Sequence, residues 1–408
     1  MGREIESGLR LFVSVTNAAG GLKVGSGRHD LSVRAIDDKG EFARCAEIYR
    51  SLCFTDRVDL LFGPFSGAML RVAAPIAEEA KMVLVNHGGA TDDLPGGRGR
   101  MLVSVAASAG DYLRTFARLL ASLKMLRKRL AIISAPTRFA RAVADGLEDA
   151  AGERAARWHG VRLKLKYRGT IDPDDPPEML MKALRRNRIN ALVSAGGIDH
   201  DIAVMRLAIR SQLYIPALAC VAAGLHQFGR EMGTDADGIV GASQWEADVA
   251  SRPALGPDPA EFARRMRAFD PDSMCEYPAA RVYGAGLATV AAVEAADTAT
   301  NTSSKSLTID QPSLRAAFSD LRTTTTFGDF AIDANGRQTG HRMLLVQWHQ
   351  GRKVVIDPAP PEQKGDVEFP SGLRMLLASL HILGPGRGNQ RRRGGEEDDD
   401  ENDDEGRT

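Results

Sequence analysis

Short apolar strands alternate with amphipathic helices along most of this chain, and that order constrains the fold more than any other feature. Strand patterns at 58–62, 82–85 and 101–105 flank a helical pattern at 66–80. Strands separated by helices pair in parallel, and the helices cover both faces of the resulting sheet. The order therefore predicts an α/β fold built on doubly wound parallel sheets.

A second series of the same kind follows in the middle of the chain. Helical patterns at 112–126, 139–150, 177–187, 201–211 and 225–232 alternate with strand patterns at 130–134, 161–167, 191–194, 217–220 and 238–240. A length of 408 residues exceeds one ordinary domain. Two doubly wound units of similar size account for these elements better than one oversized sheet.

The two ends of the ordered region have a different character. A helix is predicted at the start, over 5–15, and 31–36 alternates as a strand. The glycine-rich stretch 20–27 follows a helix, whereas a dinucleotide-binding turn follows a strand, so we interpret it as a loop. Later helices are expected at 259–269, 278–296 and 312–321, and later strands at 327–332, 343–348 and 353–356.

Charge is unevenly distributed although the formal net charge is +0. Residues 387–408 hold five Arg and nine acidic residues, which leaves about +4 on the rest of the chain. This charge distribution lacks the strong basic excess of nucleic-acid-binding proteins, so no nucleic-acid partner is expected. Residues 359–408 become Pro-rich and then charged and low in complexity, which predicts a disordered tail.

Cysteine and histidine spacing argues against a metal centre or a disulfide scaffold. The four cysteines are expected to be buried or free thiols, and a Cys45–Cys53 bridge within one predicted helix would be strained. His200 lies between two aspartates but has no second His or Cys at ligand spacing, so a solvated loop is expected there. We expect neither a metal nor another cofactor, and no apolar run is long enough to cross a membrane.

Several short patterns along the chain occur in a characteristic order. They are Asn17-Ala-Ala-Gly20-Gly21, Asp37-Asp38, Val58 to Ser66, Gly89-Ala-Thr91, Tyr277-x-Ala279-Ala280, Phe327-Gly-x-Phe330 and Gln347-Trp348. In this order and spacing they resemble the leucine/isoleucine/valine-binding proteins, the type I periplasmic-binding class that serves bacterial ABC importers. The resemblance covers roughly residues 2–358. It implies two lobes that clamp a small polar ligand around a three-strand hinge.

The resemblance also implies lobes that are discontinuous in sequence. Lobe 1 would comprise 1–123 and 244–325, and lobe 2 would comprise 124–243 and 326–358, with crossings near 121–126, 241–244 and 323–327. The family's first strand would precede Gly2, and its absence would leave unpaired backbone groups in the sheet. No export signal opens the chain, so we hypothesise a truncated N-terminus.

Two candidate anchoring turns lie at the carboxyl ends of neighbouring predicted strands. Ser66 follows a strand and opens a helix, where its hydroxyl and backbone N–H groups can receive an anion; a plain helix N-cap is the alternative. Gly89, Ala90 and Thr91 form the next strand-to-helix turn, or simply an ordinary turn. Open α/β sheets bind ligands at this edge. The resemblance assigns both turns to the ligand's carboxylate.

The second lobe would complete the site. The resemblance implies ligand contacts from Phe139, from Asp199 or His200, and from Val221. The family's acid that pairs with the ligand's ammonium falls at 220–222, where this chain has Cys-Val-Ala, so Asp199 or Asp201 would have to substitute.

The resulting prediction is a solute-binding protein that clamps an amino acid, or a related amide or carboxylate, for ABC-type uptake outside the cytoplasm. Its partners would be that small molecule and a membrane permease. The alternatives from the same fold are a ligand-sensing receptor ectodomain, fused or associated, and an amide-type regulator. A Rossmann-type enzyme would need a phosphate loop or catalytic constellation. Gly63-Pro-Phe-Ser66-Gly67 is not a Gly-x-Ser-x-Gly nucleophile elbow.

Overall fold

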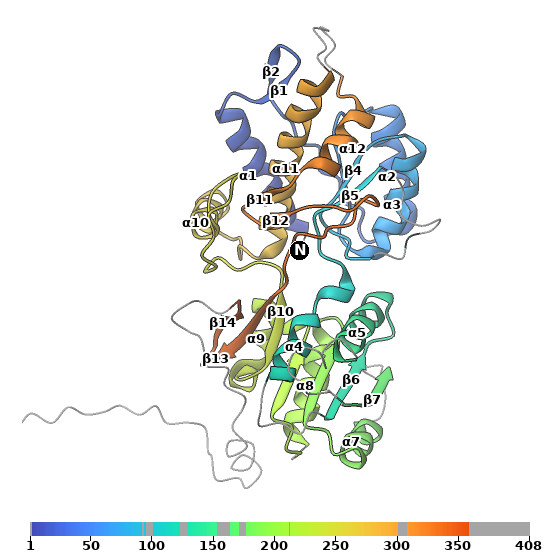
Figure 1. Cartoon of the computed structure of the whole chain (residues 1–408), viewed down its shortest axis with the longest axis vertical. Coiled ribbons are helices and arrows are strands. Elements are labelled where there is room, and N and C mark those ends of the chain that lie inside the picture. The colour runs from blue at the N-terminus through green and yellow to red at the C-terminus, as the bar shows by residue number, and fades with distance from the viewer. Residues whose placement is uncertain are drawn as a thin grey trace, which may run out of the picture.

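The computed structural model describes residues 2–91, 94, 101–122, 129–152, 164–170, 177–211, 213–300 and 308–358. These residues form two α/β units stacked along the long axis of the molecule (Figure 1). The segment 123–128, part of the first expected crossing, and the predicted tail 359–408 lie outside the described residues.

The second unit, the lower one in Figure 1, is built on a seven-stranded sheet of order β14-β13-β10-β9-β8-β6-β7. Its strands are β6 (Arg129–Ser134), β7 (Lys164–Thr170), β8 (Ala191–Ala195), β9 (Ala217–Cys220), β10 (Val240–Ser243), β13 (Leu344–His349) and β14 (Arg352–Asp357). The strands from β6 to β10 are parallel, whereas β13 pairs antiparallel with both β10 and β14. A parallel sheet with one antiparallel edge therefore supports this half of the molecule.

Helices cover both faces of that sheet, as the alternating pattern predicts. They are α4 (Arg114–Ser122), α5 (Arg138–Ala151), α7 (Pro177–Arg186), α8 (Ile198–Arg210) and α9 (His226–Met232). Leu130 and Ile132 of β6 pack in the core that α4 and α5 share, while Ala131 and Ile133 pack in the core on the other side with α7 and α8. Successive strand residues point to opposite faces, so both sides of the sheet are buried.

The first unit contains a smaller parallel sheet, formed by β3 (Leu61–Phe62), β4 (Leu84–Asn86) and β5 (Leu102–Ser104). The helices α1 (Gly2–Ala18), α10 (Pro259–Phe269) and α11 (Tyr277–Thr300) share a core with Val85 and Val103. On the opposite face, α2 (Phe42–Arg50), the π-helix η1 (Ser51–Thr55) and α3 (Gly67–Glu79) pack against Leu84 and Leu102. The helix α12 (Gln311–Asp320) completes this unit beside α11.

Two local predictions were wrong. Residues 31–36 form no strand, because no described strand lies beside the free edge of β3 to pair with. The stretch 20–27, predicted as a loop, contains part of a hairpin of β1 (Leu22–Val24) and β2 (Gly27–His29). The two-residue turn of this hairpin is Gly25-Ser26, and Gly25 supplies the positive φ of 60° that such a tight turn requires.

The end of the described chain also differs in one respect from expectation. The segment predicted as a single strand at 327–332 belongs to a hairpin of β11 (Thr323–Thr325) and β12 (Gly328–Phe330). Phe327, Phe330 and Ile332 pack in the core of the first unit, although residues from 326 onward were expected in the second. The amide of Gln338 still donates to Val105 O, at 3.3 Å. The chain therefore leaves the first unit only after Gln338.

Candidate functional site

The two predicted anchoring turns lie in contact at the edge of the first sheet. Ser66 follows β3 and caps α3, and its Oγ accepts a hydrogen bond from Met69 N at 3.3 Å. The N–H of Ser66 donates to Gly88 O at 3.2 Å, which joins the turn after β3 to the turn after β4. A Cβ built on Gly67 would lie 2.9 Å from the Cβ of Thr91. Ser66 and Thr91 are therefore neighbours, as the sequence predicted.

Asn86, a residue that the sequence did not single out, holds the second turn in shape. It is fully buried at the end of β4. Its side-chain oxygen accepts from Gly89 N at 2.7 Å, and its Nδ2 donates to Gly89 O at 2.8 Å and to Ser104 Oγ at 2.9 Å. An Asn that closes an apolar strand directly before His-Gly-Gly was the available signal, because Asn side chains commonly organise such turns.

Ser66 has the backbone geometry of a constrained residue. Its φ is 81°, a region that non-glycine residues seldom adopt and that occurs preferentially at functional sites. Because its Oγ already accepts from Met69 N, its hydroxyl proton remains available for donation. The start of α3 also places a positive dipole end here. This corner of the fold is suited to receive an anionic oxygen.

A cavity of about 400 Å³ opens beside the second turn and is lined from both units. Ala90 and Thr91 line it from the first unit, and Arg138 and Arg141 of α5 line it from the second. Arg114, the first residue of α4, also lines it from the second unit. The cavity therefore lies between the two units, next to one of the candidate anchors. Its charged lining is mixed, because Asp111, Asp145, Asp149 and Arg337 line it as well.

The second-unit candidates occupy different surroundings. Phe139 is half-buried and packs edge-on against Tyr112, with ring centroids 5.3 Å apart. Asp199 is exposed in the first turn of α8, and Val221 is half-buried directly after β9. A solvated loop was expected around His200, and this prediction was wrong. His200 lies in α8, is 5% exposed and has its Nδ1 3.3 Å from Ser194 Oγ. The helix starts earlier than predicted, which turns this residue toward the core.

Asp201, considered above as a substitute partner for a ligand ammonium, is fully buried. Its Oδ1 accepts from Ser194 Oγ at 2.7 Å and its Oδ2 accepts from Ala222 N at 2.8 Å. Burial raises the pKa of this carboxyl, and the hydrogen bonds from His200 and Ser194 oppose that rise. Its Oδ1 thus ties α8 to β8, and its Oδ2 ties α8 to the segment after β9.

Asp201→Ala is expected to lower the free energy of unfolding by about 2 kcal/mol, because the buried Ala222 N–H and Ser194 hydroxyl lose their acceptors. Chemical denaturation followed by circular dichroism would measure the loss. Asp199→Ala, at the exposed neighbouring position, is the matched control and is expected to change stability by less than about 0.5 kcal/mol. Equal effects of the two substitutions would contradict a structural role for Asp201.

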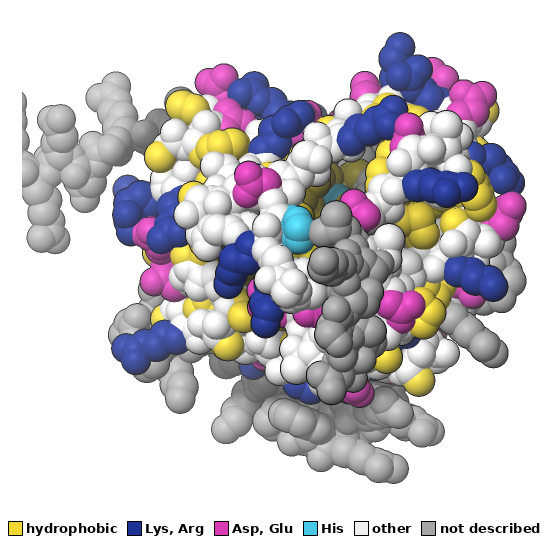
Figure 2. All heavy atoms as spheres, turned by 90° about the horizontal axis from the view of Figure 1, so that it is seen from above, with side chains coloured by type: hydrophobic (Ala, Val, Ile, Leu, Met, Phe, Trp, Pro, Cys, Tyr) yellow, Lys and Arg dark blue, Asp and Glu magenta, His cyan; other side chains and the backbone are white. Residues whose placement is uncertain are grey.

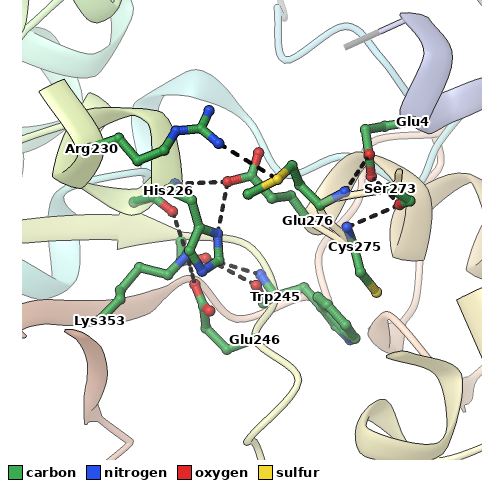
Figure 3. Close-up of polar contacts among 12 residues, drawn as sticks. Glu4, His226, Arg230, Trp245, Glu246, Ser273, Cys275, Glu276 and Lys353 are labelled. Atoms are coloured by element: carbon green, nitrogen blue, oxygen red, sulfur yellow. Dashed lines mark hydrogen bonds and ion pairs between the residues drawn. The ribbon is translucent and has the colours of Figure 1, made fainter. Parts of the chain in front are cut away.

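A second cavity of about 400 Å³ is also lined by residues of both units, and Figure 3 shows polar contacts made by some of these residues. The backbone N–H and Nδ1 of His226, at the start of α9, lie 2.7 and 3.0 Å from Oε1 of Glu276, which precedes α11. Burial pushes the pKa of Glu276 upward, but the hydrogen bonds from His226 outweigh it and leave the pKa lowered. Lys353 and Glu246 form a further ion pair at 2.8 Å. Glu246 and Glu276, two acids of this cavity labelled in Figure 3, are thus already paired with Lys353 and His226.

The cysteine prediction is confirmed, since all four cysteines are buried and unbridged. Burial raises the pKa of Cys45 to about 11, so its thiol stays protonated at neutral pH. Within the described ranges no three His, Cys, Asp or Glu residues gather as metal ligands do. Over the same part of the chain no helix combines the length and apolarity needed to span a bilayer. On the face seen in Figure 2, basic and acidic side chains are interspersed.

The chain matches the family model described as periplasmic binding protein over residues 1–353. It belongs to the periplasmic binding protein family. The protein is therefore a non-enzymatic solute-binding protein, and the family indicates an extracytoplasmic location. The family assignment also confirms the class that the sequence patterns resembled.

Solved structures of similar fold include other periplasmic binding proteins. A putative branched-chain amino acid ABC transporter protein from Rhodospirillum rubrum is 18% identical, with 87% of this chain and 95% of that chain covered and a TM-score of 0.66. An ABC transporter substrate-binding protein from Desulfitobacterium hafniense in complex with Leu is 18% identical, with coverage of 86% and 95% and a TM-score of 0.68. A solute-binding protein from Rhodopseudomonas palustris BisB5 in complex with 3,4-dihydroxybenzoic acid is 15% identical, with coverage of 87% and 92% and a TM-score of 0.66. At these identities the likeness concerns the fold.

Proposed function

We propose that this periplasmic binding protein clamps a small carboxylate-bearing solute between its two units and delivers it to the permease of an ABC importer. The contact between the turns after β3 and β4 carries the proposal. It gathers the Ser66 hydroxyl, the start of α3 and Thr91 at one edge of the first sheet. Leucine and 3,4-dihydroxybenzoic acid, held by two of the similar structures, share a carboxylate.

In this proposal the two units are the two lobes. The first was predicted to comprise residues 1–123 and 244–325. Phe116 and Leu120 of α4, however, pack with β6 in the second unit, whereas the packing of Phe327, Phe330 and Ile332 supports extension of the first to Gln338. The second was predicted to comprise 124–243 and 326–358, and in this proposal it includes α4 and begins its last segment after Gln338. Ser66, Gly89, Ala90 and Thr91 would anchor the carboxylate. Phe139, Asp199 and Val221 would approach only on closure, which shifts the population toward the closed form. His200, buried under α8, would support that surface from behind.

The test is a thermal-shift screen of carboxylates, amino acids and amides, followed by titration calorimetry. A ligand at 100 times its Kd stabilises the folded protein by about 2.7 kcal/mol, which is readily seen as a rise in Tm. Ser66→Ala and Thr91→Ala are each expected to weaken binding about tenfold, the effect of losing one hydrogen bond to a charged group. Thr298→Ala removes an exposed hydroxyl of α11 and serves as the control. Unchanged affinity in both site variants, with the fold intact, would exclude this anchoring site.

A further inference from the structure

Two hydrogen bonds to one carboxylate oxygen join the units outside the three segments that connect them (Figure 3). Oε1 of Glu276, in the first unit, lies 2.7 Å from the backbone nitrogen and 3.0 Å from Nδ1 of His226, in the second. A carboxylate only accepts, so both nitrogens donate. Nη1 of Arg230, one turn further along α9, donates to Sδ of Met274 at 3.6 Å. The start of α9 and the segment before α11 therefore contact each other directly.

The second-unit side of this bridge is a fixed segment that also carries Val221, one of the residues predicted to close over the solute. The 3-10 helix η3 (Ala222–Gly224) lies between Val221 and His226. Three side chains bond to the backbone of η3 at 2.8 Å each, namely Asp201 of α8, Trp348 of β13 and Lys353 of β14. Because η3 is held from three elements, Val221 and His226 must move together with the second unit.

The first-unit side is held in a similar way. Glu4 of α1 accepts from Ser273 Oγ at 2.9 Å and from Met274 N at 2.8 Å. The N–H of Cys275 donates to Ser273 Oγ at 3.0 Å, and Cys275 has a φ of 51°, which a non-glycine residue seldom adopts. The side chain of Glu276 is only 13% exposed. Its carboxylate is therefore presented to the second unit on a support fixed to α1.

This arrangement links the bridge to closure over the solute. Any movement of the second unit that brings Val221 toward Thr91 also carries His226 toward Glu276, because each pair joins the same two units. A contact between separate units exists only while they are close together. Each hydrogen bond of the bridge therefore stabilises the closed arrangement relative to an open one.

We propose that the bridge between His226 and Glu276 is a latch that favours closure of the two units and thereby raises solute affinity. The inference rests on the proposed function, because it concerns closure over a solute anchored at Ser66 and Thr91. His226 and Glu276 are positioning residues in this proposal, since they act on the arrangement of the units and not on the solute itself.

The first test measures the distance between the units without solute. Spin labels are attached to exposed positions of α2 and α7 through Glu47→Cys and Lys182→Cys, since the four native cysteines are buried. Pulsed electron paramagnetic resonance is expected to show a longer mean distance when Glu276→Ala is added. Asp248→Ala removes an exposed acid that lines the same cavity and is expected to leave the distance unchanged. An unchanged distance in Glu276→Ala would overturn the proposal.

A double-mutant cycle on affinity tests whether the two residues act as a pair. Leucine and 3,4-dihydroxybenzoate are titrated by calorimetry into the full-length protein. Glu276→Ala is expected to weaken binding about fivefold, and His226→Ala about threefold because the backbone N–H at position 226 still donates. The double variant is expected to bind no more weakly than Glu276→Ala alone. If the two single effects multiply, or if neither substitution changes the affinity, the latch is refuted.

The outcomes separate the latch from the proposed function. Ser66→Ala is expected to weaken binding without changing the solute-free distance, whereas Glu276→Ala changes both. If neither solute binds the unaltered protein, the result counts against the proposed function, and the solute-free distances still decide on the latch. Should Glu276→Ala not fold, Glu276→Gln takes its place, with a smaller lengthening expected because an acceptor oxygen remains. A distance identical to that of the unaltered protein would then exclude the latch.

Discussion

Replacing Gly88 by alanine is expected to lower the free energy of unfolding by about 3 kcal/mol and to weaken solute binding more than either hydroxyl substitution. A Cβ at this position would lie 2.3 Å from Pro64 O and 2.7 Å from the Cα of Phe65. Both obstacles are backbone atoms, so no side-chain rotation can relieve the overlap. The turn after β3 must move away from the turn after β4, and the hydrogen bond from Ser66 N to Gly88 O is lost with it.

Gly197→Ala provides the matched control for this substitution. Gly197 also follows a strand and precedes a helix, but a Cβ there meets nothing within 4 Å. The free energy of unfolding of Gly197→Ala is expected to stay within about 0.5 kcal/mol of that of the unaltered protein. Guanidinium denaturation gives the stability of both variants, and calorimetry with a solute identified by screening gives their affinity. Equal behaviour of the two alanine variants would refute close packing as the reason for Gly88.

Acidification is expected to destabilise the protein through His87. The side chain is 3% exposed, and its pKa is lowered from 6.5 to about 3 by burial and by the charge of Arg281. Between these two pH values His87 binds a proton in the unfolded chain but stays neutral in the folded chain. The stability contributed by neutral His87 is therefore complete above pH 6.5 and declines as the pH falls toward 3. At pH 4 the loss amounts to about 3 kcal/mol.

A comparison across pH isolates this contribution from those of the carboxyl groups. Unfolding free energies are measured at pH 7.5 and pH 4 for the unaltered protein and for His87→Gln, which cannot take up the proton. The fall in stability between the two pH values is expected to be smaller in the variant by about 3 kcal/mol. An identical fall in both proteins would show that His87 protonates as readily in the folded state as in the unfolded one.

The alternation of strands and helices allowed the fold to be predicted because it depends on burial, which leaves a period in the sequence. The strand at 217–220 and the helix at 259–269 were predicted with the bounds that β9 and α10 have. The strand at 31–36 was wrong because strand formation also needs a neighbouring backbone, which the local pattern does not encode. The hairpin at Leu22–His29 was missed because its short strands carry little alternation.

The candidate site was predictable only where its residues follow strands. Ser66 and Thr91 lie in turns that follow predicted strands, and parallel strands bring their carboxyl ends together, so their proximity could be expected. Arg281 gives no such signal, because it lies in an apolar helix and its burial, which leaves Nε and Nη2 without a hydrogen-bond partner, appears only in three dimensions. Asp201 was considered for its charge, but its enclosure depends on where α8 begins.

The position of β13 has a consequence for synthesis of the protein. This strand lies between β10 and β14 in the seven-stranded sheet, yet residues 244–343, which include α10, α11 and α12, separate it from β10 in sequence. During translation the edge of β10 that pairs with β13 therefore stays unpaired until nearly all of the first unit has emerged from the ribosome. For an exported protein of this kind, that open edge would favour holding the chain unfolded until translocation is complete.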